Sequence, residues 1–303
     1  MLLFCYTENV FNLERREFFM YKLIACDLDE TLIDDDALVC QRNIDAIKAA
    51  TKLGVKFVPA TGRGYRAIEK TLAEIGLKDK VNEYVISFNG GCITENKDNR
   101  IMKFQGLDFA KADELYRLGL KYDVCLHVYT KDMVYVYNAD EDEIKYLKLR
   151  HVYKIIDEPN LDFLKGQDIA KVLYGSTDVP YLEKIASEIS NTTNDLDVSY
   201  SSNRYLEFNH QGVNKGEGLL WLADKLGIKP EETMALGDNF NDLSMIKAAG
   251  LGVGVANVNP KMKDDCDYIT KVDNNQGGVG EAIEKFVLEK WWGKDRWNLT
   301  RKS

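Results

Sequence analysis

The chain has 303 residues, of which 45% are apolar and 29% are charged, and its 40 basic and 49 acidic residues give a net charge of −9. This composition is typical of a globular protein, and the length favours two domains. The acidic balance argues against a dedicated nucleic-acid binder, and no apolar run approaches the roughly 18 residues that would span a bilayer.

The start of the chain precedes the first periodic core pattern, which begins at Tyr21. Residues 1–19 lack the basic start and the long apolar stretch of a secretory signal peptide, so they are predicted to be an N-terminal extension. The six cysteines are scattered, with no Cys-x-x-Cys pair. We therefore expect reduced thiols and a cytoplasmic location.

Strands and helices alternate in the first part of the chain. Lys22–Cys26 is a short apolar run of the kind that forms a buried parallel strand. Residues 41–53 place apolar side chains on one helical face, and Gly54 ends that helix. The next predicted elements are a strand over 55–58, a helix over 64–76 and a strand over 84–88. This alternation predicts a parallel, doubly wound sheet.

The pattern then changes, because strands rich in aromatic residues replace the regular alternation of strands and helices. The predicted elements are a hairpin over 91–105, a helix over 108–122, strands over 126–129, 133–137 and 171–174, and a helix over 180–190. They indicate a second α/β domain with an antiparallel sheet. The alternation of helices and strands returns with a helix over 215–226, a strand over 233–236, a helix over 241–249 and a strand over 252–255.

The predicted fold is therefore α/β, with a Rossmann-like core interrupted by an inserted α/β domain. The core is assigned to residues 20–104 and 204–288, and the insertion to residues 105–203. Residues 289–303 form a basic, tryptophan-rich tail, which packs on the core or a second subunit, or else contacts an anionic surface or nucleic acid.

Acidic residues follow the first predicted strand directly. Asp27 and Asp29 enter a loop there, where both carboxylates can converge on one metal ion and one substrate atom. A solvated turn or a helix cap is the alternative, since Asp34, Asp35 and Asp36 follow at once.

Three further segments lie at comparable positions. Thr61 and Gly62 follow the second strand, where a hydroxyl and a backbone amide can bind a phosphate oxygen, although such a pair is usually a turn. A second acidic cluster containing Asp238 follows the strand over 233–236. Lys215 lies at a helix start, and a lone lysine is usually a solvated charge.

In this order, the segments resemble the haloacid-dehalogenase-like superfamily of phosphatases with an aspartate nucleophile. The segments are Asp27-Leu-Asp29-Glu-Thr31, Thr61-Gly62-Arg63, Asn214-Lys215-Gly216 and Gly237-Asp238-Asn-Phe-Asn241-Asp242. The resemblance spans residues 20 to about 288. It is to the Cof-type branch, in which a large C2-type cap is inserted between the second and third motifs.

The resemblance implies a role for each matching residue. Asp27 would attack phosphorus and become an aspartyl phosphate, and Asp29 would protonate the leaving group and then activate water. Magnesium would be bound by Asp27, Asp238 and the main-chain carbonyl of Asp29. The implied phosphate-binding residues are Leu28, Thr61, Gly62, Lys215 and Asn241. The implied supporting residues are Asp242, Arg63, Asn89 and Gly90.

Electrostatics requires a similar set of groups. A phosphate monoester dianion that approaches several carboxylates is repelled unless Mg²⁺ and a local cation neutralise the charge. Lys215 is the candidate cation. The three histidines, His127, His151 and His210, are too dispersed in the sequence for a histidine-based mechanism.

The expected function is a magnesium-dependent phosphatase that hydrolyses a small phosphorylated metabolite, such as a sugar phosphate, with neither nucleic acid nor membrane as a partner. A phosphomutase or phosphotransferase with the same nucleophile is one alternative, and a non-catalytic module that binds a phosphorylated ligand is another. The aromatic cap residues Tyr129, Tyr137 and Tyr174, with Arg204, can recognise a polar ring, although alternating aromatics in strands more often pack within the sheet.

Overall fold

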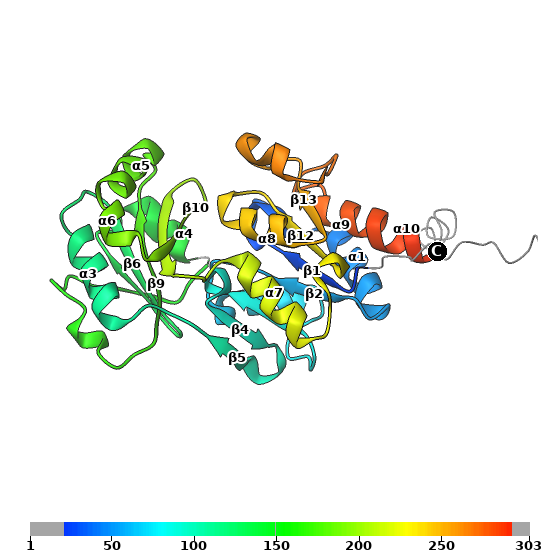
Figure 1. The fold of residues 1–303 in the computed structure, drawn as a ribbon, viewed down its shortest axis with the longest axis horizontal. Helices are drawn as coiled ribbons and strands as arrows, with labels where there is room; N and C mark the ends of the chain where they lie inside the picture. The colour runs from blue at the N-terminus through cyan, green and yellow to red at the C-terminus, as the bar shows by residue number, and fades with distance from the viewer. Residues whose placement is uncertain (1–20, 149, 293–303) are drawn as a thin grey trace, which may run out of the picture.

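The computed structural model of the protein describes residues 21–148 and 150–292. The elements form two lobes that lie side by side, a core lobe built on a parallel sheet and a cap lobe built on a larger sheet (Figure 1). The predicted extension over 1–19 and residues 293–303 of the predicted tail lie outside the described residues. The rest of the tail is α10 (Glu289–Trp292), in which Trp291 is exposed.

The core lobe contains a five-stranded sheet whose paired strands all run parallel. Its order is β14-β13-β12-β1-β2. The strands are Leu23–Cys26 (β1), Lys56–Pro59 (β2), Thr233–Gly237 (β12), Leu251–Gly254 (β13) and Tyr268–Ile269 (β14). The fully buried β1 lies inside the sheet between β12 and β2, as its uninterrupted apolar run predicts.

Helices cover both faces of this sheet. They are Gln41–Lys52 (α1), Glu69–Glu74 (α2), Lys215–Lys225 (α7), Leu243–Ala248 (α8) and Gly278–Ile283 (α9). Successive residues of a strand point to opposite faces. Ile24 packs with α1 and α9, whereas Leu23 packs with α7 and α8. The predicted doubly wound sheet is therefore confirmed.

A small antiparallel sheet extends the core lobe beyond β2. It consists of Tyr84–Ser87 (β3), Cys92–Glu95 (β4) and Arg100–Phe104 (β5). The predicted hairpin is β4 and β5. Ile86 of β3 also bridges Ala60 in the parallel sense, just after β2, so the two sheets are continuous at this edge.

The cap lobe contains a six-stranded sheet in the order β10-β11-β9-β6-β7-β8. The strands are Cys125–Thr130 (β6), Val134–Tyr137 (β7), Tyr153–Ile155 (β8), Ile169–Gly175 (β9), Leu196–Ser201 (β10) and Tyr205–His210 (β11). All pairs are antiparallel except the parallel pair of β7 and β8. The expected antiparallel sheet is thus present.

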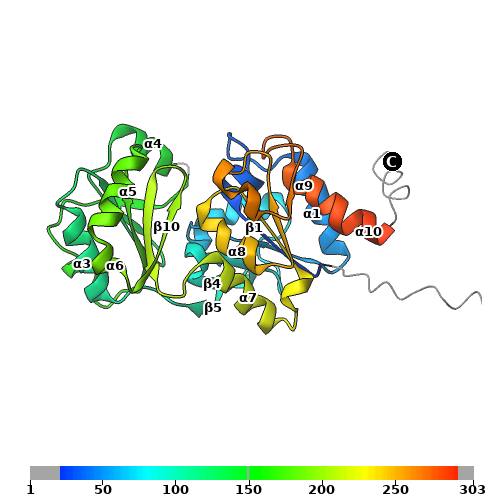
Figure 2. The same ribbon diagram turned by 45° about the horizontal axis from the view of Figure 1, so that its top comes forward.

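The two faces of the cap sheet differ in polarity. The cap helices are Phe109–Gly119 (α3), Glu141–Lys148 (α4), Val179–Glu188 (α5) and Ser190–Thr193 (α6). Helices α3, α5 and α6 lie on the side of the sheet away from the core lobe (Figures 1 and 2). Val172 and Phe208 pack with α3 and α5, whereas their chain neighbours Lys171 and Glu207 line a cavity on the opposite side.

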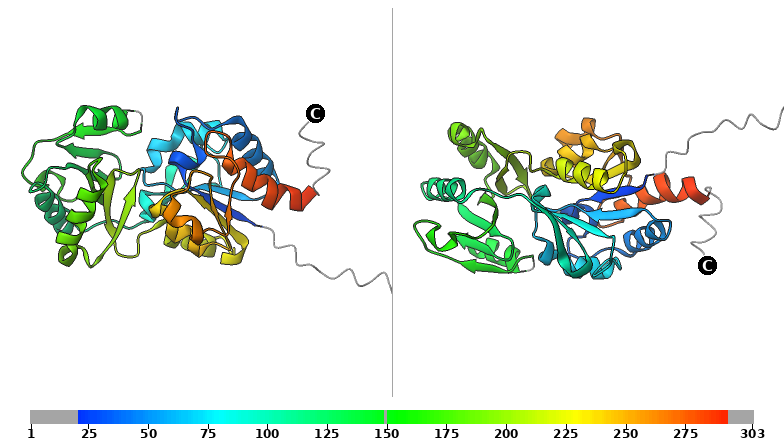
Figure 3. Two further views of the ribbon diagram at one scale, coloured as in Figure 1. Left: turned by 90° about the horizontal axis from the view of Figure 1, so that it is seen from above. Right: turned by 60° about the horizontal axis from the view of Figure 1, so that its bottom comes forward.

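The predicted domain boundary between residues 203 and 204 would separate β10 from β11. Strand β11 pairs with β10 along its whole length and also pairs with β9 in the cap sheet. We therefore propose that the inserted domain continues to His210, so that the sheet stays whole. The chain passes from one lobe to the other after β5 and returns after β11, and α10 lies at the end of the core lobe away from the cap lobe (Figure 3).

None of the helices in the described part of the chain combines the length and the apolar character that a membrane crossing requires.

Candidate active site

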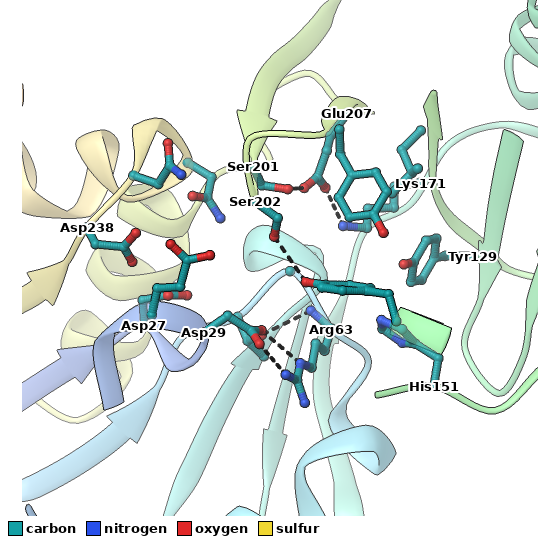
Figure 4. A pocket seen from close by; sticks show the side chains of 18 residues that line it. Asp27, Asp29, Arg63, Tyr129, His151, Lys171, Ser201, Ser202, Glu207 and Asp238 are labelled. Carbon is teal, nitrogen blue, oxygen red and sulfur yellow. Dashed lines mark hydrogen bonds and ion pairs between the residues drawn. The ribbon is translucent and has the colours of Figure 1, made fainter. Parts of the chain in front are cut away.

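A cavity of about 570 Å³ lies between the two lobes, and both contribute to its wall. Figure 4 shows Asp27 and Asp238 on one side of it and Lys171, Tyr129 and His151 on the other. The core-lobe lining residues are Asp27, Asp29, Glu30, Thr61, Gly62, Arg63, Asp238, Asn239 and Asn241. The cap-lobe lining residues are Tyr129, Tyr146, His151, Lys171, Leu173, Ser201, Ser202, Tyr205 and Glu207.

The core side of the cavity is formed where three parallel strands end. Cys26, the last residue of β1, pairs with Pro59 of β2 on one side and with Leu236 of β12 on the other. The residues that follow these strands therefore emerge at the same sheet edge, where α/β proteins bind their ligands. This register brings Asp27 and Asp238 together.

A buried lysine joins two of the predicted acids. Lys215 is the first residue of α7, and the preceding Asn214 caps this helix by accepting a hydrogen bond from the amide of Glu217. The Lys215 Nζ lies 2.5 Å from Asp27 Oδ1 and 2.6 Å from Asp242 Oδ1. Burial raises the pKa of Asp27 to about 8, and the charge of Asp242 adds to this shift while Lys215 opposes it.

Three buried carboxylates form a group that can hold a cation. Asp27, Asp238 and Asp242 each offer an oxygen within 4.8 Å of the others. Burial, followed by the charges of Asp242 and Asp27, raises the pKa of Asp238 well above its usual range. Crowded oxygen ligands of this kind fit a hard divalent cation, which would relieve their repulsion.

The three carboxylates are not equally available to a metal ion. Asp242 accepts hydrogen bonds from the amides of Asp238 and Asn239 on one oxygen and contacts Lys215 with the other. Asp238 accepts a hydrogen bond from Thr31 at 2.7 Å. The second oxygens of Asp27 and Asp238 accept no hydrogen bond from the described residues, so these two acids fit a metal site better than Asp242 does.

The side chain of Asp29 is bound by two arginines. Arg63 donates two hydrogen bonds to its carboxylate, one of them 2.8 Å long from Nε, and Arg150 Nε of the cap lies 3.4 Å from it. Burial raises the pKa of Asp29, but the charge of Arg63 and then that of Arg150 outweigh it, so the pKa is lowered overall. Asp29 is therefore an anion in this arrangement, and a proton-donor role requires its release from Arg63.

The remaining predicted phosphate-binding residues differ in which groups they present to the cavity. Thr61 is buried, and its hydroxyl accepts a hydrogen bond from the amide of Arg63 at 3.0 Å. Gly62 and Asn241 line the cavity. The side chain of Leu28 packs in the core instead, which leaves only its backbone for a ligand.

Asn89 and Gly90 support the site from outside the cavity wall. Asn89 joins the lobes, because its Nδ2 donates to Glu207 Oε2 of the cap at 2.8 Å. Gly90 has a φ of +99°, and a Cβ there would lie 2.3 Å from the carbonyl oxygen of Asn214. Glycine thus allows this turn to approach the residue before Lys215.

The ionic residues of the cap sheet belong to none of the sequence motifs described above. Lys171 and Glu207 form a buried ion pair in the cavity wall, each side chain 2% exposed. Each is a single charged residue within an otherwise largely apolar strand, in the segments Ile-Ala-Lys-Val-Leu-Tyr-Gly and Tyr-Leu-Glu-Phe-Asn-His. That interruption was the available signal. Arg150 carried no such signal.

The aromatic and histidine candidates divide between cavity and sheet. Tyr129 and His151 line the cavity. Tyr137 packs against Tyr116, and Tyr174 donates a hydrogen bond to the carbonyl of Leu115. Two further candidates lie outside the cavity lining: Arg204 pairs with Glu143, and His210 lies beside Gln105.

The chain matches the haloacid dehalogenase-like hydrolases over residues 24–283. It is 30% identical over 274 residues to the 5-amino-6-(5-phospho-D-ribitylamino)uracil phosphatase YcsE of Bacillus subtilis, covering 90% of this chain and 99% of that protein. It is 31% identical over 272 residues to a phosphoglycolate phosphatase of Methanobrevibacter smithii, covering 88% and 98%. A solved haloacid dehalogenase-like hydrolase from Bacteroides thetaiotaomicron is 29% identical with a TM-score of 0.74, covering 88% and 99%.

Proposed function

The chain belongs to the Cof-type haloacid dehalogenase-like hydrolases and is a phosphoric monoester hydrolase, and we propose that it hydrolyses a small phosphorylated metabolite through an aspartyl phosphate on Asp27 with the help of Mg²⁺. The observation that carries this proposal is the ion-paired group in which Lys215 lies between Asp27 and Asp242 beside the buried Asp238. It joins a nucleophile, a cation and carboxylates suited to a metal ion at one point of the cavity.

Each of these residues has a physical task. Lys215 holds the Asp27 carboxylate in place through its Oδ1 atom, and this carboxylate attacks phosphorus in line. Thr61 and Gly62 bind the phosphoryl oxygens from the side, and Asn241 adds a further polar contact. Asp27 and Asp238 would hold Mg²⁺, which when bound supplies positive charge for the phosphate dianion.

Asp29 serves as the acid and base of the reaction. It follows Asp27 by two residues and lines the same cavity, so it can reach the leaving oxygen once a substrate displaces it from Arg63. Once released, it takes up a proton from solvent and gives it to that oxygen, which leaves as the alcohol. In the second step the Asp29 carboxylate takes a proton from the water that attacks the aspartyl phosphate.

We propose a small metabolite as the substrate, because the cap sheet closes one side of the cavity over the predicted nucleophile. The two named relatives act on different phosphate esters, a ribitylaminouracil phosphate and phosphoglycolate, so the reaction is shared while the alcohol varies. We propose a sugar phosphate here.

The first prediction concerns phosphate release. Wild-type protein with Mg²⁺ should release inorganic phosphate from members of a set of sugar phosphates, and Asp27→Asn should lower kcat by ~10⁴ or more, because an amide is not a nucleophile for phosphorus. Asp36→Asn, an exposed acid of the same loop, is the control and should retain activity. An isomerised product without released phosphate would instead identify a mutase.

A further inference from the structure

The cap side of the cavity contains a buried ion pair for which the reaction has no task. Lys171 of β9 and Glu207 of β11 lie on the sheet face that is directed at the core lobe. Replacement of a buried ion pair by apolar residues often leaves stability unchanged or improves it, so such a pair is weak evidence of a stabilising role. Its place in a cavity wall points to a ligand.

The pair retains capacity for further hydrogen bonds. Among the described residues, the ammonium group of Lys171 donates a hydrogen bond to Glu207 alone, so two of its three N–H groups remain available. The Glu207 carboxylate accepts from Lys171, Ser201 and Asn89, and has room for one more donor. The pair thus presents both donors and an acceptor.

The pair is also close to the predicted phosphate site. A Cβ on Gly62 would lie 3.3 Å from Lys171 Nζ and 3.2 Å from Asn89 Oδ1. That oxygen is buried and has no hydrogen-bond partner among the described residues. The cavity-lining groups that an alcohol bound to the phosphate would meet on this side are therefore an ammonium and a carboxylate, with the Asn89 amide behind them.

The two cavity-lining cations among the described residues are both paired in this arrangement, Arg63 with Asp29 and Lys171 with Glu207. The release of Asp29 that the reaction requires would change the first pair, whereas the second has no part in that step. The pair of Lys171 and Glu207 carries no net charge, so it offers hydrogen bonds to a polar leaving group without favouring an anionic one.

Two of the tyrosine rings of the wall contact cations of the protein. The ammonium of Lys171 lies 4.8 Å from the centroid of Tyr129. The guanidinium groups of Arg150 and Arg204 lie 4.0 Å and 4.9 Å from the centroid of Tyr146. The ammonium of Lys171 is therefore held in place both by Glu207 and by the ring of Tyr129.

We propose that Lys171 and Glu207 bind neighbouring hydroxyl groups of the alcohol, so that the enzyme selects phosphate esters of polyols and sugars over esters of alcohols without further hydroxyl groups. One hydroxyl group can accept a hydrogen bond from Lys171 while the next one donates to Glu207. This inference rests on the proposed phosphatase function and assigns its selectivity to two residues of the cap.

The test compares ribitol 5-phosphate with n-pentyl phosphate, which have the same chain length and differ in their hydroxyl groups. We expect kcat/KM of the wild type to favour ribitol 5-phosphate by about 100-fold or more, since a site built to bind hydroxyls discriminates strongly against an analogue without them. The paired variant Lys171→Met with Glu207→Gln avoids an unpaired buried charge, and in it the ratio should fall toward one.

A matched control is the ion pair of Lys56 and Glu83, which is partly buried and lies outside the cavity lining. Lys56→Met with Glu83→Gln should keep the wild-type ratio. If the wild type shows no preference, or if the Lys171 and Glu207 variant loses both activities equally, the selectivity inference is wrong while the phosphatase proposal stands. If the wild type releases no phosphate from either ester or from any sugar phosphate, the proposed function itself fails.

Discussion

At the scale of single residues, the proposed reaction depends on the protonation state of Asp29. The sequence places it two positions after the predicted nucleophile, but its side chain is bound by Arg63 and Arg150 and its pKa is lowered. The chain therefore holds the predicted proton donor as an anion, in contact with one arginine from each lobe. A substrate must compete with these contacts before Asp29 can act.

The second prediction follows from this role. Asp29→Asn should lower kcat for a sugar phosphate by about 10²–10⁴-fold, because general acid–base catalysis is lost. The loss should be smaller for p-nitrophenyl phosphate in a single-turnover measurement of alcohol release, since p-nitrophenolate leaves without a proton. Equal losses for both substrates would show that Asp29 does not protonate the leaving group. Asp36→Asn serves again as the control.

At the scale of elements, the start of α7 depends on a contact with the turn after β3. Gly90 approaches the carbonyl of Asn214, and Asn214 caps the helix that carries Lys215. The turn also holds Asn89 against Glu207 of the cap. One short segment thus sets the position of the cationic residue and of the cap contact.

The third prediction tests this contact. Gly90→Ala should lower the free energy of unfolding by about 3 kcal/mol, from the strain of a positive φ and from the clash with Asn214. Gly54→Ala is the control, because Gly54 has a φ of +89° but open space around it, and it should cost about 1 kcal/mol. Chemical denaturation measures both. Equal costs would mean that the close approach is unimportant.

At the scale of the whole molecule, the net charge of −9 is distributed unevenly. Part of the excess acid is gathered where the core strands end, and Lys215 compensates it only in part. Burial and then this repulsion raise the pKa values of Asp27 and Asp238. The folded chain is therefore a molecule that a bound cation should stabilise.

The fourth prediction concerns that stabilisation. Mg²⁺ at about 100 times its Kd should raise the free energy of unfolding by about 2.7 kcal/mol, and EDTA should reverse the effect. Asp238→Asn should abolish the response, whereas Asp264→Asn, an exposed acid in the same lobe, should keep it. Thermal unfolding with and without Mg²⁺ measures the difference. An undiminished response in Asp238→Asn would place the cation elsewhere.

The sequence by itself determined the order of elements and the acids that follow them. Asp27, Thr61 and Asp238 could be grouped in advance, because the carboxyl ends of parallel strands meet at one sheet edge. Only the tertiary structure decided which side chains pair there. The contact of Asp29 with Arg150, the pairing of Lys171 with Glu207, and the pairing of β11 with β9 and β10 depend on strand register and on how the lobes face each other. These relations join residues 36 to 121 positions apart or whole strands, and no local pattern in the chain encodes them.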